Sequence, residues 1–187
     1  MKVTRIGLIC LLITIGVISR IIPHIPNFAP ITAIALLAGV AFQDRKISML
    51  VPITSMVLGD ILLQITSGSG FHSTWLWVYA GIIAMTLIGR FLKNHLSPSA
   101  ILSSSIAGSI IFFFISNFGV WASTNMYSPT LVGLQACYLM GIPFFYGTFL
   151  SDVFYSLLFF KIYLYYTNKK PLCLPEGLFA TRLKLKN

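Results

Sequence analysis

Three ionisable residues stand out because each interrupts or ends a run of apolar residues. Asp60 lies in VLGDILL, Asp152 lies in TFLSDVFY, and Arg20 ends the first apolar run. A charged side chain within a bilayer costs about 2.5–3.5 kcal/mol on insertion scales, so it usually faces the interior of a helix bundle. If the apolar runs cross alternately, all three residues lie at one depth, in the outer half of the membrane. We expect an ion-paired cluster there, which either binds a solute or an ion or only locks the helices through a bidentate arginine pair.

The segment RIIPHIPNFAP, residues 20–30, is the most unusual stretch of the chain. Its three prolines favour an extended conformation and stop the first helix. His24, Asn27 and Phe28 would project from this stiff segment, which suits a preorganised ligand contact. The alternative is that the segment is only a rigid connector between two helices.

Other polar and aromatic residues fall on the same outer side. Asn117 and Trp121 lie in ISNFGVWAS, and His72 lies in the loop GSGFHSTW. Asn117 could instead serve a helix–helix hydrogen bond, worth only about 0.6 kcal/mol, and His72 could simply be solvated. The candidate substrate-binding residues are therefore Arg20, His24, Asn27, Asp60, His72, Asn117, Trp121 and Asp152.

Catalytic and metal-binding motifs are missing from the sequence. The three histidines do not have the spacing of a zinc-binding helix, and neither GxSxG nor a Walker motif occurs. Cys10, Cys137 and Cys173 have no CxxC spacing. We therefore expect no catalytic residue, no metal and no cofactor, and any ATP-driven step would need a separate subunit.

The elements that position these residues follow from the composition. Of 187 residues, 57% are hydrophobic and only 9% are charged, whereas soluble domains carry about 25% charged residues. This composition predicts an all-α, polytopic membrane helix bundle. About six transmembrane helices are expected, from apolar runs at residues 6–22, 28–42, 47–65, 74–91, 100–121 and 143–165.

Two parts of this pattern are irregular. The second run is short for a full crossing, so we expect it to tilt inside the bundle or to begin lower in the membrane. The stretch Leu131–Ile142 is too short to span, and we interpret it as an interfacial or re-entrant helix before Pro143. The chain then divides into a six-helix transmembrane domain, residues 1–166, and a basic tail, residues 167–187.

The basic residues predict the orientation. With the N-terminus inside, twelve of the thirteen Lys and Arg residues fall on the cytoplasmic side and only Arg20 falls outside. This bias is what the positive-inside rule describes. We expect both termini in the cytoplasm and the chain in the bacterial inner membrane. The net charge of +9 does not indicate nucleic-acid binding, because the charges separate apolar runs instead of forming one basic face.

The elements PHIPNFAP (23–30) and SNFGVW (116–121) resemble a little-characterised family of small bacterial integral membrane proteins, with similarity over residues 17–162. That family in turn resembles the substrate-binding S components of energy-coupling-factor vitamin transporters. The resemblance implies a vitamin pocket beneath the outer loops. It also implies a recurrent polar set that includes Asn27, Asp60, Asn117 and Asp152. Because the first helix lacks an Ala-xxx-Ala docking face, dependence on an energising ATPase module stays open.

Taken together, the residues and the resemblance favour a membrane carrier or capture protein for a small polar organic solute, such as a vitamin or cofactor precursor. We do not expect an enzyme. The first alternative is a structural or assembly membrane protein whose polar cluster only holds helices together. The second is a membrane-embedded enzyme that acts on lipid.

Overall fold

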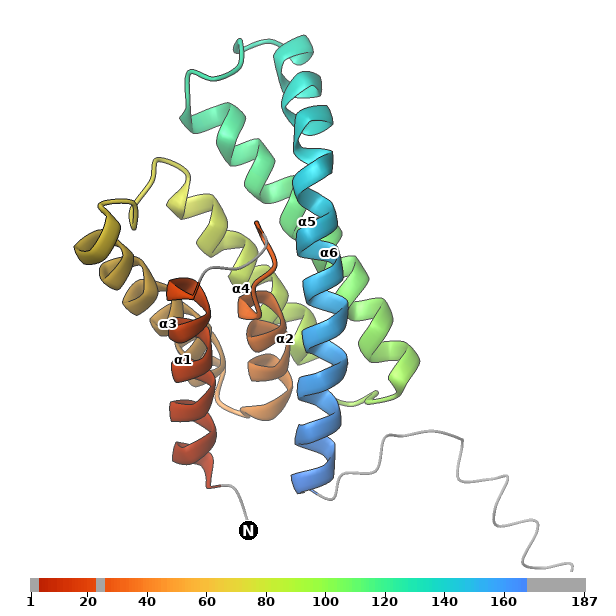
Figure 1. Ribbon diagram of the computed structural model, residues 1–187. Helices are drawn as coiled ribbons and strands as arrows, with labels where there is room; N and C mark the ends of the chain where they lie inside the picture. Colours follow the sequence, from red (N-terminus) through yellow and green to blue (C-terminus); the bar gives the residue numbers. More distant parts are fainter. Residues whose placement is uncertain (1–3, 23–25, 168–187) are drawn as a thin grey trace, which may run out of the picture.

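The computed structural model describes residues 4–22 and 26–167, and over these residues the protein is all-helical (Figure 1). The predicted all-α architecture is confirmed for this part of the chain. The helices follow one another in the order α1 (Arg5–Ile21), α2 (Ile31–Ala41), α3 (Arg45–Ser67), α4 (Trp75–Leu92), α5 (Pro98–Ser123) and α6 (Leu131–Thr167).

Local sequence signals set several helix ends. Thr4, Asp44 and Ser97 each accept, through a side-chain oxygen, a hydrogen bond from the backbone of the first turn of α1, α3 and α5. Such caps satisfy backbone N–H groups that have no partner within the helix. Gly68 ends α3 in a left-handed conformation, with φ of 69°, which a glycine adopts without steric cost.

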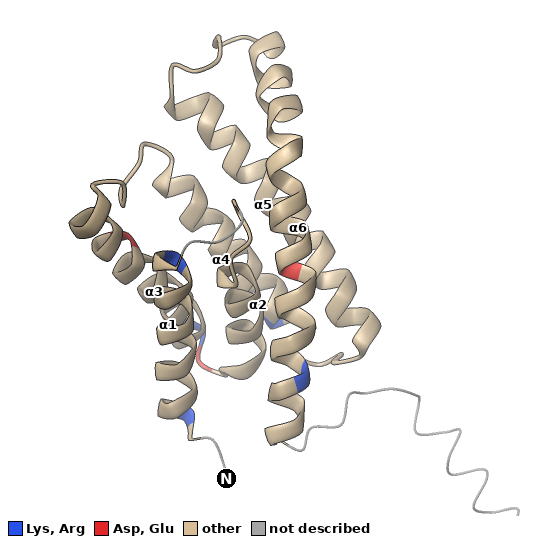
Figure 2. Cartoon of the chain, in the orientation of Figure 1, with Lys and Arg blue, Asp and Glu red and all other residues tan. Residues whose placement is uncertain are grey.

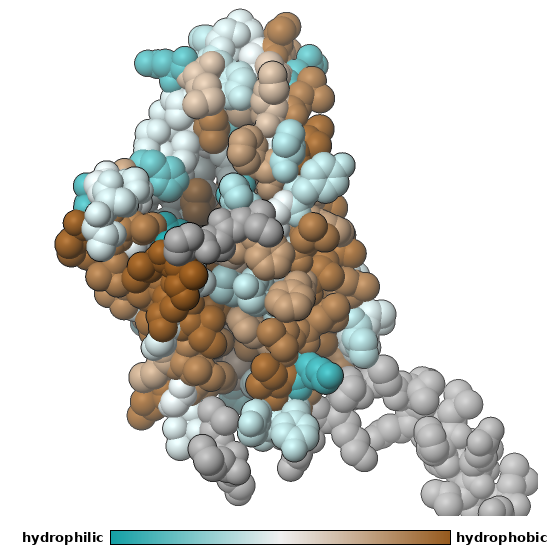
Figure 3. All heavy atoms as spheres, viewed as in Figure 1, coloured by the Kyte–Doolittle hydropathy of each residue, from teal (hydrophilic) through white to brown (hydrophobic). Residues whose placement is uncertain are grey.

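The chain is a membrane protein. Four of the described helices, α3, α4, α5 and α6, are long and apolar enough to cross a bilayer. The other two are shorter, with 17 residues in α1 and 11 in α2. Apolar side chains cover α1 and much of α6 on the face drawn in Figure 3, as expected of surfaces that meet lipid.

Helix α2 forms the core of the bundle. Every residue from Ile31 to Val40 is buried, although the helix spans only about 16 Å at 1.5 Å per residue. It packs against all the other helices, most extensively against α4 and α3. The expectation that the second apolar run is too short for a full crossing is confirmed.

The contact between α2 and α4 is a backbone contact. A Cβ atom at Gly39 would collide with the carbonyl oxygen of Thr86, and one at Gly89 would collide with that of Leu36. Glycine is therefore required on both sides of this crossing, because any side chain would separate the helices.

Helix α6 corrects one prediction. Residues 131–142 do not form a separate interfacial or re-entrant helix, because they continue through Pro143 as part of one helix of 37 residues. Packing on α5 stabilises this extension: Tyr138 donates to the carbonyl oxygen of Phe114 at 3.1 Å and its ring contacts Phe113. Membrane helices tolerate proline where neighbouring groups compensate for the lost bond. At about 55 Å, α6 is longer than the hydrocarbon core, and its first turns extend beyond the other helices (Figure 1).

The two ends of the bundle differ in charge (Figure 2). At the Arg5 end, Arg5 begins α1 and Arg45 begins α3, while Arg90 and Lys161 lie near the ends of α4 and α6. The guanidinium of Arg90 donates to the carbonyl oxygen of Gln43 at 3.3 Å, between α2 and α3. At the opposite end, called here the Arg20 end, α1 and α3 finish and α4 begins.

Candidate functional site

A cavity of about 400 Å³ lies toward the Arg20 end of the bundle. Its size falls in the range of small-molecule pockets, about 300–1,000 Å³. Every helix contributes to the wall, together with the segment before α2 and the loop before α4. The cavity is lined by Arg20, Asn27, Ala29, Ile31, Thr32, Met56, His72, Thr74, Val78, Phe112, Phe113, Ser116, Asn117, Val120, Gly141, Phe144, Phe145, Thr148 and Ser151.

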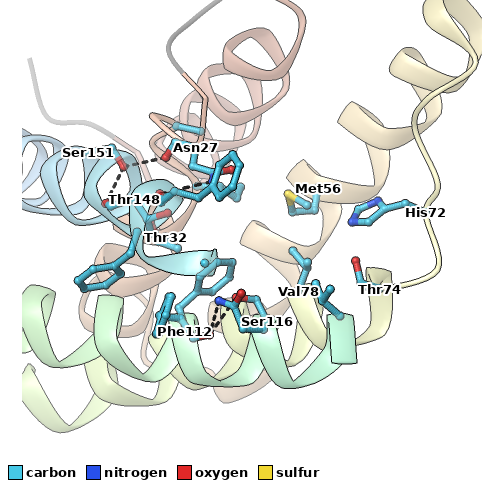
Figure 4. A pocket seen from close by; sticks show the side chains of 18 of the residues that line it. Asn27, Thr32, Met56, His72, Thr74, Val78, Phe112, Ser116, Thr148 and Ser151 are labelled. Atoms are coloured by element: carbon cyan, nitrogen blue, oxygen red, sulfur yellow. Dashed lines mark hydrogen bonds between the residues drawn. The ribbon is translucent and has the colours of Figure 1, made fainter. Parts of the chain in front are cut away.

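The polar groups of the cavity lie on opposite walls (Figure 4). Asn27, Thr32 and Ser151 gather with Thr148 on one side, and His72 faces them across the cavity beside Met56 and Thr74. Four phenylalanines of α5 and α6 add apolar surface, namely Phe112, Phe113, Phe144 and Phe145. The wall therefore offers hydrogen-bonding groups at two edges and aromatic surface between them.

Arg20 and Asp60 form an ion pair between α1 and α3. Asp60 is fully buried, and its second oxygen accepts a hydrogen bond of 2.7 Å from the hydroxyl of Tyr79. Gly59 makes room for this pair, because a Cβ atom there would collide with the arginine side chain. Asp60 does not line the cavity, so it acts on the cavity through Arg20.

Arg20 keeps donor capacity toward the cavity, which it lines. Among the residues that the structure describes, its Nη1 donates only to the sulfur of Met56, at 3.4 Å, and its buried Nε has no hydrogen-bond partner. A guanidinium has five N–H donors, and a thioether is a weak acceptor. An oxygen-rich group of a solute would find unsatisfied donors here.

Asp152 is placed elsewhere than expected. Its two oxygens accept hydrogen bonds from the hydroxyls of Thr32 and Ser109, the latter at 2.6 Å, and it is fully buried. The prediction of one cluster containing Arg20, Asp60 and Asp152 is therefore wrong. The physical reason is the position of α2, which packs on both α3 and α6, while those two helices make no direct contact in the described part of the chain.

The segment before α2 rests on α6. Asn27 adopts a positive φ of 60°, which asparagine tolerates better than most residues. Its amide donates to the carbonyl oxygen of Phe144 at 3.5 Å, and its own carbonyl accepts from Ser151 at 3.5 Å. Gly147 allows the close approach, since a Cβ atom there would collide with the carbonyl oxygen of Pro26. His24, also a candidate, lies outside the described residues.

Asn117 lines the cavity from α5. Its Nδ2 donates to the carbonyl oxygen of Phe113 at 2.9 Å, and its backbone carbonyl accepts from the thiol of Cys137 at 3.3 Å. Gly141 of α6 lies directly against the amide, where a Cβ atom would collide with the side-chain oxygen. That oxygen has no donor among the described residues, so it remains able to accept a hydrogen bond.

Of the remaining candidates, His72 lines the cavity and Trp121 does not. The indole of Trp121 donates to the carbonyl oxygen of Ser128 at 3.0 Å, and its ring packs on Phe118. Trp121 thus holds the connection between α5 and α6 and lies outside the wall of this cavity.

Sequence reasoning missed the hydroxyl groups of Thr32, Ser116, Thr148 and Ser151 as cavity residues. Their spacing carried a weak signal, since Thr148 and Ser151 lie three residues apart and so share a helix face with Gly141. Serine and threonine are too common in membrane helices for that signal to stand out.

The side chains that line the cavity can bind a small molecule. Among the described residues no group of three or more His, Cys, Asp or Glu side chains could hold a metal ion. The cavity instead combines one guanidinium, one imidazole, two amides and several hydroxyls with aromatic surface. Such a wall can recognise a small molecule through a few convergent polar groups.

The match with known proteins is at the level of a family. Residues 1–173 match the model of a family described as a family of unknown function (DUF6580). No curated protein and no solved structure matches the chain. The matched residues include all six described helices, and so the whole cavity wall.

Proposed function

We propose a function for a chain that belongs to this family of unknown function (DUF6580): it is a membrane carrier or capture protein for a small polar organic solute. The observation that carries the proposal is the cavity of about 400 Å³ with polar groups on opposite walls. A bundle held together only by its own packing gains nothing from unfilled space, because every void forfeits contacts between its walls.

The chemistry of the wall indicates the kind of solute. Arg20 carries the one full charge among the described lining residues, and its guanidinium keeps N–H donors that no described residue accepts. A carboxylate, phosphate or carbonyl oxygen would accept hydrogen bonds from it. The phenylalanines favour a flat, apolar body between the polar edges. We therefore propose a solute with an oxygen-rich end and a planar part, and binding without chemical conversion.

The orientation forms part of the proposal. Basic residues near the ends of four helices gather at the Arg5 end, and the positive-inside rule places that end in the cytoplasm. In the bacterial inner membrane the cavity would then face the outside, and both termini would lie inside. Resemblance to the S components of energy-coupling-factor transporters supports a vitamin or cofactor precursor as the solute. An ATPase module is a candidate source of energy.

A cavity-filling variant tests the proposal directly. Ser116→Phe introduces a ring into the cavity wall, and Ser103→Phe introduces the same ring at an exposed position of the same helix as a control. Both variants and the wild type are purified from the native host in mild detergent, and their small molecules are identified by mass spectrometry. We expect one compound with the wild type and the control that is absent from Ser116→Phe.

Two results would contradict the carrier. Equal sets of small molecules from all three proteins would show that the cavity holds no solute, which favours the structural role. Chemical change of an added lipid over time would favour an enzyme.

A further inference from the structure

We propose that Asp152 and the hydroxyl groups around it form a binding site for one monovalent metal cation, Na⁺, buried between α2, α5 and α6. The site lies outside the solute cavity and shares one residue with it, Thr32. The inference does not depend on the proposed function, because it rests on the contacts of a different carboxylate.

The charge of Asp152 is the first argument. The side chain is fully buried, and its partners in the described chain are the hydroxyls of Thr32 and Ser109. The one ion pair found among the described residues joins Arg20 to Asp60. A buried carboxylate without a cation is costly in a medium of low dielectric constant. A bound cation would remove this cost.

The second argument is the supply of oxygen atoms. The Oγ of Ser109 lies within hydrogen-bond distance of two acceptors, Asp152 at 2.6 Å and the carbonyl oxygen of Ser105 at 2.9 Å, and its single proton can be donated to one of them at a time. Each hydroxyl also has lone pairs that can face a metal ion. Carboxylate, hydroxyl and carbonyl oxygens are the ligands that hard cations prefer.

Two orphan hydroxyls are the third argument. The Oγ atoms of Ser105 and Ser156 are fully buried and have no hydrogen-bond partner within residues 4–22 and 26–167. Ser156 lies one turn after Asp152 on α6, and Ser105 lies one turn before Ser109 on α5, so each shares a helix face with its neighbour. Because α5 and α6 run antiparallel side by side (Figure 1) and Ser109 contacts Asp152, we infer that one turn along each helix places both serines on the same side of the carboxylate, toward the Arg5 end.

A buried hydroxyl without a partner is costly because it has lost its hydrogen bonds to water. A serine in a helix can usually avoid this cost by donating to the carbonyl oxygen one turn back. Neither Ser105 nor Ser156 does so. Coordination of a cation would satisfy both oxygens and explains why two serines occupy this interface instead of alanines.

The number of carboxylates selects the charge of the cation. Asp152 supplies one negative charge, and the other ligands are neutral. Sites for Ca²⁺ and Mg²⁺ generally gather more acidic groups or substrate phosphates. A monovalent ion leaves this site electrically neutral, which is what a bilayer interior requires.

The experiment measures thermal unfolding of the full chain in detergent, with NaCl replacing choline chloride at constant ionic strength. We expect a saturable rise of the melting temperature, about 5 °C when Na⁺ exceeds its dissociation constant a hundredfold. Asp152→Asn should abolish this response. Ser103→Ala, which removes an exposed hydroxyl of α5 that bonds to Ala100, should leave the response unchanged.

The double variant Ser105→Ala/Ser156→Ala keeps the carboxylate and tests the site even if Asp152→Asn fails to fold. We expect its apparent affinity for Na⁺ to fall at least tenfold. Equal melting temperatures in Na⁺ and choline would overturn the proposal, as would an unchanged Na⁺ response in either variant. A response to pH alone would also overturn it, since a proton would then neutralise Asp152. Solute retention in Ser116→Phe is a separate measurement, so failure of one proposal leaves the other standing.

Discussion

Asp60 and Asp152 are the same residue type, equally buried in one bundle, and yet the protein neutralises them differently. Asp60 is paired with Arg20 and Tyr79 at the side of the cavity. Asp152 is surrounded by hydroxyls on the far side of α2. The difference shows that depth along the membrane does not determine the partner. The helix packed between them decides which side chains meet.

The largest effect is expected from breaking the Arg20–Asp60 pair. Asp60→Ala leaves a mostly buried guanidinium without its counter-charge and should lower the free energy of unfolding by about 3 kcal/mol, measured by thermal or denaturant unfolding in detergent. The double variant Arg20→Met/Asp60→Leu should recover most of that loss while abolishing solute retention. If the double variant were as unstable as Asp60→Ala, the loss of stability would come from losing the ion pair and not from leaving a buried charge unpaired.

The next largest effect is expected at Thr32. Thr32→Val keeps the shape of the side chain and removes a hydrogen bond to a buried carboxylate, which should cost about 2 kcal/mol of folding free energy. Serine at this position should restore most of it. If valine were neutral, the hydroxyls around Asp152 would contribute little to stability, and the contrast with Asp60 would disappear.

Asn117 contacts neither carboxylate, so a variant at this position can change solute binding without changing the stability of the fold. Asn117→Ala should weaken solute retention about tenfold, equivalent to about 1.4 kcal/mol, because a free amide oxygen is lost from the cavity wall. Its melting temperature should change little. Retention is measured by mass spectrometry at graded wash volumes, and a large stability loss with normal retention would assign Asn117 to helix packing.

Tyr79→Phe should give the smallest effect, about 1 kcal/mol of folding free energy. In the described part of the chain, the hydroxyl of Tyr79 is one of two partners of Asp60, and Arg20 remains to balance the charge. Thermal unfolding beside Thr32→Val makes the comparison direct. A greater loss in Tyr79→Phe than in Thr32→Val would reverse the ranking of the two carboxylate sites.

The helical architecture and the participation of Arg20 in an ion pair were predictable from sequence for one physical reason, whereas the choice of Asp60 as its partner was left open. A bilayer penalises charge so strongly that an ionisable residue within an apolar run is expected to have a partner inside the bundle. The basic residues near the helix ends and the shortness of the second apolar run could likewise be recognised in the sequence. Four of the eight candidate residues, Arg20, Asn27, His72 and Asn117, line the cavity.

The partners of Asp152 were not predictable, because hydroxyls carry little signal in a hydrophobic sequence. Uniformly apolar helices also show no periodic stripe, so the face of α6 that turns to the cavity could not be assigned. Pro143 was interpreted as a break between two segments, although packing on α5 carries the helix through it. Trp121 was assigned to the cavity from its neighbours in sequence, while its indole reaches the adjoining loop.

The backbone contact of Gly39 and Gly89 limits how the protein can move. Because the two backbones touch at this crossing, α2 and α4 cannot slide or rotate past each other there without a steric clash. We expect this pair to act as a fixed pivot during any transport cycle. The solute would then leave through displacement of α1 with α3, or of α5 with α6, around a centre that keeps its shape.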